Sequence, residues 1–339
     1  MTKNMLCMAI ALLQMVSITF AQNNAAVEKT AAPRRVWFDT DIMIGLPERA
    51  PREVDDGVTL IMALAIPSIE IVGISTITYV DYGYDVTKKI LNWYAPERNI
   101  PVYKGSPEAA DLGVENEATR ALTAALQREK LSILALGPAT NIATVLKNHP
   151  ELAKQMDEIV FCAGRTPGFA FKPGLQKSIV SDFNFEKDVE SFKVILDSGV
   201  KVVFSGFECS AYLLLGRPDI QFLQDGNEAD RWLYSVLVPW QQRAKQLFGV
   251  EGFIPYDVTP LGHFTHPEYF LYYRDIPVRI ETRKNDATIG RVIPPTKPFM
   301  EVSYKYKNKW KVDYAYKTLP GFEEIVLELL KCPDLKGDK

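Results

Sequence analysis

The sequence lacks an excess of charge of either sign. Its 339 residues contain 39 Lys and Arg against 42 Asp and Glu, so the net charge is −3 with neutral histidines, and the isoelectric point is about 5.8. Proteins that bind nucleic acid carry a concentrated positive field, which this composition does not supply. We therefore expect a small-molecule ligand and no nucleic acid partner.

Cysteines are few, and repeats are absent. The four cysteines form no CxxC pair, and three of them, an odd number, follow residue 21. Their spacing predicts no disulfide, and we interpret Cys162 and Cys209, in or beside apolar runs, as small buried hydrophobic residues. The chain also has no internal repeat and no GxGxxG turn after its first expected strand. This last absence argues against a dinucleotide-binding protein.

The N-terminus has the pattern of a signal peptide. Lys3 gives a positive start, an apolar run extends from Met5 to Phe20, and small residues end at Ala21. We predict a signal peptide over residues 1–21 and a polar tether over 22–34, so that the protein is exported to the periplasm or secreted. The alternative is an uncleaved membrane anchor, for which the run is short. After cleavage no membrane association is expected.

Apolar runs alternate with amphipathic segments after residue 34. The expected strands are 36–38, 69–77, 101–103, 131–136, 158–163 and 200–206, and the expected helices between them are 56–65, 86–94, 117–128, 142–147 and 189–197. Near-continuous apolar strands have both faces of their sheet covered. We predict one α/β domain over residues 35–332, with a mostly parallel open sheet flanked by helices and a Rossmann-like core.

The last third of the chain follows a different pattern. Residues 218–253 are predicted to be helical, and their aromatics, Trp232, Tyr234, Trp240 and Phe248, indicate either core and subunit packing or a wall for an aromatic ligand. A short helix is expected over 258–264. Late antiparallel strands are expected at 279–281, 299–306 and 310–314, before a last helix over 322–330.

Four acidic residues lie close together near the start of the predicted domain. Asp39 and Asp41 follow the first strand, and Asp55 and Asp56 open the first helix. Ligand sites of parallel sheets form at the carboxyl ends of strands. Four carboxylates placed there repel one another unless a cation lies between them, and a hard cation with oxygen ligands fits this requirement. Capping of a turn and a helix is the alternative, and it explains only one or two of the acids.

Four sequence blocks, in order, resemble the inosine-uridine-preferring nucleoside hydrolases. They are Asp39-Thr40-Asp41 with Asp55-Asp56, the run ILALGPATNIA over residues 133–143, Asp182-Phe183-Asn184-Phe185, and Tyr256-Asp257 leading into His266-Pro267-Glu268-Tyr269-Phe270. The resemblance runs from about Val36 to the C-terminal helix. It implies calcium-dependent hydrolysis of the N-glycosidic bond of a ribonucleoside or related N-riboside, which releases base and ribose. It also implies a homodimer or a homotetramer.

The resemblance assigns metal ligands to individual residues. It implies that Ca²⁺ is bound by the side chains of Asp41, Asp56 and Asp257 and by the backbone carbonyl of Leu136. Asp39 would orient the loop that carries the first of these ligands. A ligand set made only of oxygen atoms suits calcium.

The resemblance also assigns catalytic and substrate-binding residues. Asp55 would take a proton from the attacking water, and Asp182, Asn184 and Asp41 would bind the ribose. Tyr256 stands where the family has the histidine that protonates the departing base. A tyrosine has a reference pKa near 10 and is a poorer donor, although it could hydrogen-bond or stack on the base. Of the three histidines, His263 is the one weighed as a replacement, while His149 and His266 are interpreted as structural.

Two further departures concern loops beside the expected site. Thirteen residues, Ile42–Val54, separate Asp41 from Asp55 where the family motif has three. They form either a solvated loop that bulges outward or a lid whose Arg49 or Arg52 meets the ligand. Tyr79-Val80 replaces a Gly-Asn pair whose Asn contacts ribose, and Asp81 or Tyr82 could compensate. Arg165 either enters the site or is a solvated loop charge.

These departures leave a second function open. A metal-dependent protein that binds ribose or a nucleoside with little or no turnover would keep the acidic residues but would not need a proton donor for the base. The substitutions at Tyr256 and Tyr79-Val80 favour this binding protein. The presence of Asp55 favours the hydrolase, because a binding protein has no use for a base.

Overall fold

A computed structural model describes residues 32–47, 50–290 and 292–331. The predicted signal peptide and most of the predicted tether lie outside these residues. Within the described part of the chain, no helix has the length and apolar character needed to cross a membrane.

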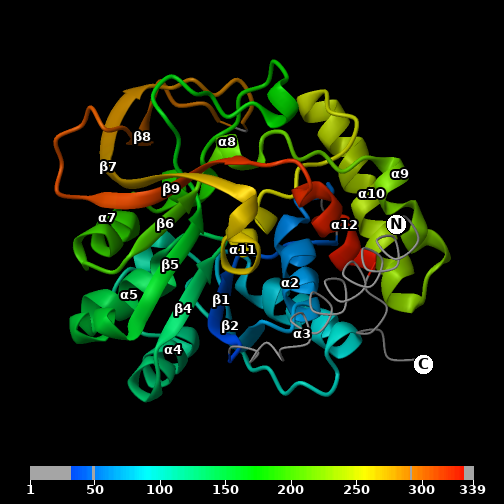
Figure 1. The fold of residues 1–339 in the computed structure, drawn as a ribbon, viewed down its shortest axis with the longest axis horizontal. Coiled ribbons are helices and arrows are strands. Elements are labelled where there is room, and N and C mark those ends of the chain that lie inside the picture. The colour runs from blue at the N-terminus through cyan, green and yellow to red at the C-terminus, as the bar shows by residue number, and fades with distance from the viewer. Residues whose placement is uncertain (1–31, 48–49, 291, 332–339) are drawn as a thin grey trace, which may run out of the picture. The chain divides into compact units, whose positions relative to one another are not determined.

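Nine strands of the described chain form one mixed sheet in the order β3-β2-β1-β4-β5-β6-β9-β7-β8 (Figure 1). The strands are β1 Arg34–Thr40, β2 Ile69–Thr76, β3 Val102–Lys104, β4 Leu131–Ala135, β5 Met156–Cys162, β6 Val202–Ser205, β7 Phe270–Lys284, β8 Thr296–Val302 and β9 Lys311–Thr318. Strands β1 to β6 are parallel to their neighbours, and β9 is parallel to β6. Strand β7 is antiparallel to both β8 and β9. The predicted mostly parallel α/β fold is confirmed, with the correction that β9 extends its parallel part.

Helices cover both faces of this sheet. The α-helices are α2 Asp55–Ala65, α3 Val80–Tyr94, α4 Glu117–Arg128, α5 Thr140–Asn148, α6 Phe183–Lys187, α7 Val189–Asp197, α8 Phe207–Ser210, α9 Arg217–Ile220, α10 Glu228–Phe248, α11 Val258–Thr265 and α12 Phe322–Lys331. Short 3-10 helices occur at Ala109–Asp111, Pro150–Gln155, Pro173–Leu175, Gln221–Asp225 and Pro267–Tyr269. Figure 1 shows α4, α5 and α7 on one side of the sheet and α2, α3 and α12 on the other.

The apolar strands divide their side chains between two cores. On β1, Val36 and Phe38 join the core beneath α2, α3 and α12, whereas Trp37 points the other way into the core beneath α4, α5 and α7. On β4, Ile133 and Leu134 are likewise fully buried in opposite cores. Alternate side chains of a strand point to opposite faces, so a strand that is apolar at every position requires cover on both faces. This requirement explains why the apolar runs predicted the architecture.

The predicted boundaries fail most clearly at β7. The prediction gave residues 279–281, but the strand spans Phe270–Lys284. Its pairing with β9 shifts register twice, and Asp275 has a φ of 49° within the strand. An extra residue in one strand disrupts the alternation that marks a strand in sequence. The first half of β7 therefore carried no clear period.

Candidate active site

A cavity of about 230 Å³ opens beyond the carboxyl ends of β1, β4 and β5. Its lining residues are Asp41, Met43, Glu53, Asp55, Asp56, Leu136, Cys162, Ala163, Phe171, Val180, Ser181, Asp182, Phe183, Asn184, Phe207, Tyr256 and Asp257. Every residue that the sequence assigned to metal, base or substrate is among them. The first and last of these residues, Asp41 and Asp257, are more than 200 positions apart, and the parallel sheet brings their segments to one edge.

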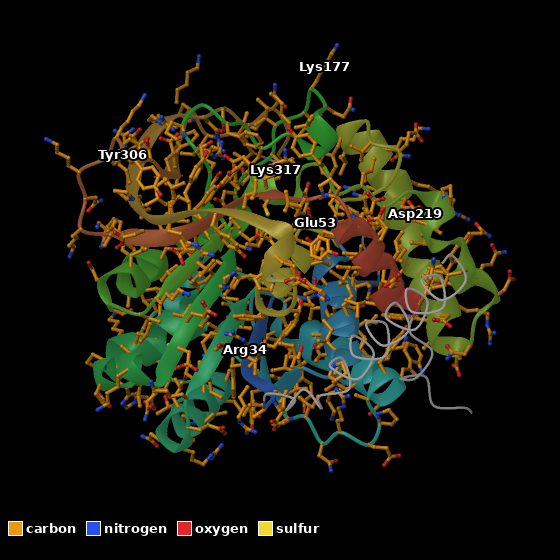
Figure 2. All side chains as sticks on the ribbon, viewed as in Figure 1. Arg34, Glu53, Lys177, Asp219, Tyr306 and Lys317 are labelled. Carbon is orange, nitrogen blue, oxygen red and sulfur yellow. The ribbon has the colours of Figure 1, made fainter. Side chains whose placement is uncertain are left out.

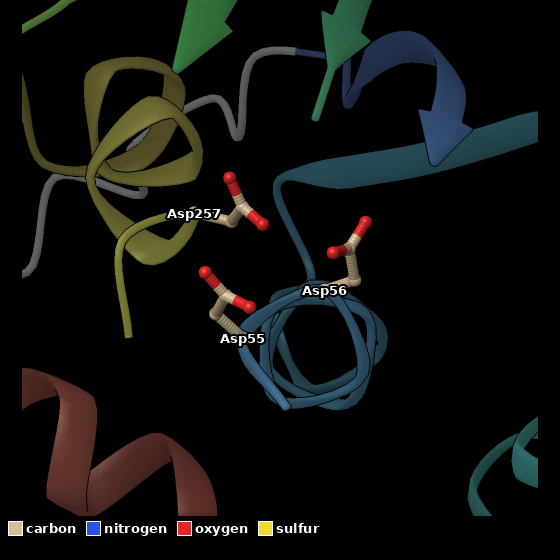
Figure 3. Close-up of side chains that lie close together, drawn as sticks. All are labelled: Asp55, Asp56 and Asp257. Atoms are coloured by element: carbon tan, nitrogen blue, oxygen red, sulfur yellow. The ribbon is translucent and has the colours of Figure 1, made fainter. Parts of the chain in front are cut away.

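Three buried carboxylates meet in this cavity. Asp55 and Asp56 come from the first turn of α2, Asp257 directly precedes α11, and one carboxylate oxygen of each lies within 4.8 Å of the others (Figure 3). Burial, followed by the charges of neighbouring acids, raises the pKa of Asp257 well above its usual range. Asp41 is affected in the same way, by burial first and then by Asp56 and Asp55.

The cavity contains nothing positive to offset these charges. Among the described residues, no Lys, Arg or His lines it. The donor set consists of carboxylates and backbone carbonyls, which a hard divalent cation prefers. These residues therefore fit a metal ion, which would replace the protons that the raised pKa values require.

Hydrogen bonds hold the carboxylates of Asp56 and Asp39 in place. The Thr40 hydroxyl at the end of β1 donates to the carboxylate of Asp56, and burial is the main cause that raises the pKa of Asp56 to about 6. Asp39 is fully buried and does not line the cavity. Its carboxylate accepts hydrogen bonds from Ser75 and from Asn141, the latter over 2.9 Å. Asp39 thus ties β1 to β2 and α5, and the orienting role expected for it remains a prediction.

Gly137 permits the close approach of Asp41. A Cβ added at this glycine would lie 3.0 Å from a carboxylate oxygen of Asp41 and 2.8 Å from Ile77. Any larger residue would displace one of these side chains. The Leu-Gly turn after β4 therefore serves two purposes, since Leu136 also lines the same cavity.

The candidate ribose-binding residues are anchored by their own contacts. The Asn184 side chain donates to the Leu136 carbonyl over 2.7 Å and to the Cys162 carbonyl over 3.2 Å. The Asp182 carboxylate accepts from the backbone N–H of Gly164 over 3.0 Å, and burial raises its pKa to about 6. A carbonyl oxygen has two lone pairs, so the contact with Asn184 leaves Leu136 able to bind a second partner.

Aromatic residues form another part of the cavity lining. The rings of Phe171 and Phe207 stack with centroids 4.2 Å apart, and Tyr256 lies 5.3 Å from Phe207. Phe171 belongs to an irregular segment after β5, and Phe207 opens α8 after β6. The aromatics of residues 218–253 do not line the cavity, so their interpretation as a ligand wall is wrong. Trp240, for example, is buried in the core beneath α10.

The insertion Ile42–Val54 is part of the core as well as of the site. Ile42 and Ile44 are fully buried, and the Ile44 carbonyl accepts a hydrogen bond from Tyr82 over 2.7 Å. Met43 and Glu53 line the cavity. The outward-bulging loop is therefore wrong for the first part of the insertion.

The cationic residue of the expected lid that the structure describes does not reach the cavity. Arg52 does not line the cavity, and Arg49 lies outside the described residues. Glu53 instead presents a carboxylate with exposed surface at the cavity. Loss of solvation beside the surrounding protein, followed by the negative charge of Asp56, raises the pKa of Glu53 to about 7. The positive charge of Arg52 opposes this rise. No sequence signal distinguished Glu53 from the other charged residues of the insertion, Glu48, Arg49 and Arg52.

No histidine of the chain lines the cavity. His263 on α11 contacts Glu158 at 3.2 Å and Tyr272 at 2.8 Å. Because it does not line the cavity, it is excluded as a replacement proton donor. His149 lies near Glu115 and Glu151, and His266 contacts Thr265. Tyr256 does line the cavity, and burial, followed by the charges of Glu53 and Asp55, raises its pKa well above 10.

Three other expectations are corrected. Asp81 pairs with Lys104, and neither Asp81 nor Tyr82 lines the cavity, so neither replaces the missing Asn. Arg165 is neither in the cavity nor solvated, since it is 2% exposed and pairs with Asp286 at 2.8 Å. Cys162 lines the cavity rather than being wholly enclosed, whereas Cys209 is buried as expected.

Residues 36–318 match the family described as inosine-uridine preferring nucleoside hydrolase. The chain belongs to this family. It is 27% identical over 266 residues to "Probable uridine nucleosidase 1" of Oryza sativa subsp. japonica, which covers 68% of this chain and 79% of that protein. It is 22% identical over 250 residues to "Pyrimidine-specific ribonucleoside hydrolase RihB" of Escherichia coli O157:H7, which covers 63% of this chain and 76% of that protein.

Solved structures of nucleoside hydrolases share the fold. "Plant nucleoside hydrolase - PpNRh1 enzyme" superposes with a TM-score of 0.70 and 17% identity over 89% of this chain and 100% of that chain. "Purine-Preferring Ribonucleoside Hydrolase from Gardnerella vaginalis" gives a TM-score of 0.68 and 17% identity over 88% and 98%. Family membership supports hydrolysis of N-glycosidic bonds of nucleosides as the class of reaction, and the buried acidic residues agree with a metal-dependent enzyme.

Proposed function

We propose that the protein is a calcium-dependent N-ribosyl hydrolase that releases base and ribose from a ribonucleoside or related N-riboside after export. The observation that carries this proposal is the convergence of Asp41, Asp55, Asp56 and Asp257 with Asp182 and Asn184 in one cavity. A capping role for the acids, the alternative drawn from sequence, does not explain why Asp257 joins them from a position some 200 residues away.

Asp41, Asp56, Asp257 and the Leu136 carbonyl would hold the calcium ion. When bound, the ion would acidify a water molecule and fix the ribose hydroxyls. The buried acids favour it because their charged forms are otherwise destabilised by one another. An all-oxygen donor set and a calcium-rich environment outside the cytoplasm favour Ca²⁺ over softer ions.

The remaining polar residues would carry out the hydrolysis. Asp55 would accept the proton of the attacking water, and Asp182 and Asn184 would bind the ribose. Cleavage of the bond builds positive charge on the ribosyl ring, which the surrounding carboxylates would stabilise. Tyr256 and Phe207 would contact the departing base, so that the leaving-group side of the site is altered relative to a site with a histidine.

A binding protein with little turnover remains the second candidate. It is favoured by one observation, the absence of any histidine from the cavity lining. Both candidates predict ribose binding, and only the hydrolase predicts bond cleavage. Asp55 separates them, because its proposed role requires turnover.

The test uses the mature protein, residues 22–339, with calcium and a panel of nucleosides, and measures free ribose. Asp55→Asn should reduce the rate of release by about 10²- to 10⁴-fold. Asp157→Asn changes an exposed aspartate outside the cavity and is the matched control. Calorimetric binding of ribose without release from any nucleoside would support the binding protein and contradict the hydrolase.

Export and assembly are proposed from the sequence. Mass spectrometry of protein recovered outside the cytoplasm should find an N-terminus at Gln22 if residues 1–21 are cleaved. An intact Met1 in that fraction would favour the membrane anchor. Light scattering should give the mass of a dimer or a tetramer, and a monomer would contradict the assembly implied by the family.

A further inference from the structure

We propose, building on the hydrolase activity above, that this site selects N-ribosides whose base carries a positive charge, such as N-ribosyl pyridinium compounds. Three observations carry the proposal: the uniform sign of the charges among the described residues that line the cavity, the aromatic residues in its lining, and the absence of a histidine to protonate the base.

The charges around the cavity all have the same sign. Six carboxylates line it, from Asp41, Glu53, Asp55, Asp56, Asp182 and Asp257, and no described Lys, Arg or His does so. A divalent ion held by Asp41, Asp56 and Asp257 leaves the other three without a positive partner in the cavity. Figure 2 labels Glu53 near the middle of the view and Lys177 at its upper edge. A cationic ligand would therefore be attracted, and an anionic one repelled.

The aromatic part of the cavity lining is apolar. Phe171 and Phe207 are stacked nearly parallel, with an interplanar angle of 13°, and Val180 and Tyr256 pack against them. Arg165 lies 4.0 Å from the centroid of Phe171. Its charge is already paired with Asp286, and it does not reach the cavity. The wall thus offers an aromatic base an apolar surface, and the cation that lies against Phe171, Arg165, is paired with Asp286 outside the cavity lining.

The missing histidine has a chemical consequence. When the C1′–N bond of a neutral nucleoside breaks, its electron pair stays on the nitrogen, and the base departs as an anion unless an acid protonates it. All three histidines lie outside the cavity, and a phenol at Tyr256 is a weaker acid than an imidazolium. An anionic base would also form among six carboxylates. The site is therefore poorly suited to a neutral base.

A cationic base removes this requirement. The electron pair of the C1′–N bond then neutralises the positive nitrogen, and the base departs as a neutral molecule without a proton donor. Water supplies the new C1′–O bond, and its proton passes to Asp55 and then to solvent, so the products are ribose, neutral base and one proton. The positive charge moves from the ring to the ribosyl group during cleavage and remains among the carboxylates throughout.

Glu53 is the residue that we assign to this selection. It comes from the insertion that separates this chain from the family motif, it lines the cavity together with Tyr256, and it is outside the set of proposed metal ligands. When it is ionised, its carboxylate adds negative charge that neither metal binding nor proton removal from water requires. Glu53 is thus a specificity residue for the charge of the substrate.

The experiment compares kcat/KM for three ribosides at fixed calcium, each divided by its uncatalysed rate of hydrolysis. Nicotinamide riboside has a cationic ring, nicotinic acid riboside carries a carboxylate in place of the carboxamide on that ring, and uridine has a neutral base. We expect nicotinamide riboside to exceed uridine by at least about 100-fold, because the carboxylates of the cavity oppose an anionic leaving base but not a neutral one. We expect it to exceed nicotinic acid riboside by about tenfold, because the carboxylate is repelled.

The outcomes separate this proposal from the one on which it rests. Release of ribose from uridine or inosine with equal or greater normalised kcat/KM overturns the charge selection and leaves the hydrolase in place. Release from no riboside at all, inosine included, overturns both. Glu53→Gln should lower the ratio of nicotinamide riboside to uridine by about tenfold. Glu97→Gln, at an exposed glutamate after α3, should leave the ratio unchanged.

A thermal unfolding curve of Glu53→Gln with calcium excludes a folding defect as the cause of any loss. If the ratio shifts by less than twofold in a folded variant, the assignment to Glu53 is wrong. If the ratio falls while nicotinic acid riboside gains relative to nicotinamide riboside, the charge of Glu53 is the cause, because a purely structural role would not distinguish two ribosides that share one ring.

Discussion

The side-chain amide of Asn184 donates a hydrogen bond to the backbone carbonyl of Leu136 over 2.7 Å. This contact joins a proposed ribose-binding residue at the start of α6 to a proposed metal ligand after β4, 48 residues earlier. The same amide reaches the carbonyl of Cys162, the last residue of β5. One side chain therefore fixes the ends of two neighbouring strands at the cavity, and the two binding functions share a support.

Asn184→Ala should weaken calcium binding and lower kcat/KM together. The change removes the donor shared by the Leu136 and Cys162 carbonyls, and loss of a group that orients a metal ligand costs about 10- to 100-fold in affinity or activity. Calorimetry with calcium and assays of ribose release measure both quantities. Asn148→Ala is the matched control, since the exposed Asn148 also donates to a backbone carbonyl, that of Gly113. An effect on kcat/KM with unchanged calcium affinity would separate the two functions.

Calcium should raise the melting temperature of the wild-type protein, and a chelator should reverse the rise. A ligand at 100 times its Kd adds about 2.7 kcal/mol to the free energy of unfolding. Asp41→Ala and Asp257→Ala should abolish the shift, because both carboxylates belong to the proposed ligand set. Asp157→Ala should retain it. A normal calcium shift in both cavity variants would show that the ligands are misassigned.

Glu158 gives a pH dependence that is independent of the metal. It lies on β5 at 6% exposure and contacts His263, Lys201 and Arg34. Burial acts to raise its pKa, but the hydrogen bonds and charges of His263 and Lys201 outweigh it and lower the pKa to about 2. A carboxyl whose pKa is lower in the folded state stabilises the fold above its unfolded pKa, and this stabilisation is lost as the pH falls toward 2.

Glu158→Gln should therefore reduce the free energy of unfolding at pH 7 by up to about 3 kcal/mol, with the difference from wild type shrinking between pH 4.5 and 2. Chemical denaturation across this range measures the difference. The exposed Glu97→Gln should show no such trend. A deficit that stays constant with pH would assign the loss to packing instead of charge.

Ile44→Ala tests whether the insertion belongs to the core. Ile44 is fully buried, so its truncation should cost about 2–5 kcal/mol of unfolding free energy. Met43 lines the cavity next to it, so KM should also rise. Leu46→Ala, at a half-buried residue of the same segment, should cost less in both measurements. Equal and small effects of the two variants would return the insertion to the status of a surface loop.

Sequence patterns predicted the regular part of this site well. The limits of α4 and α7 are as expected, and the acids of residues 39–56 lie at a strand end and a helix start, as their motif indicated. The residues of all four motif blocks that were assigned a direct role line one cavity. Such features are readable because burial of a regular element imposes a period, and because a motif fixes several residue types at a fixed spacing.

The sequence by itself determined the parallel α/β fold, the family and the acidic residues, because these depend on local periods and short motifs. Only the tertiary structure decided which loop residues reach the cavity. Phe171, Phe207 and Glu53 come from segments without a period, and the direction of their side chains depends on distant packing, such as that of Ile42 and Ile44 in the core. The negative charge of the cavity, its aromatic wall and the exclusion of every histidine are therefore properties of the folded chain.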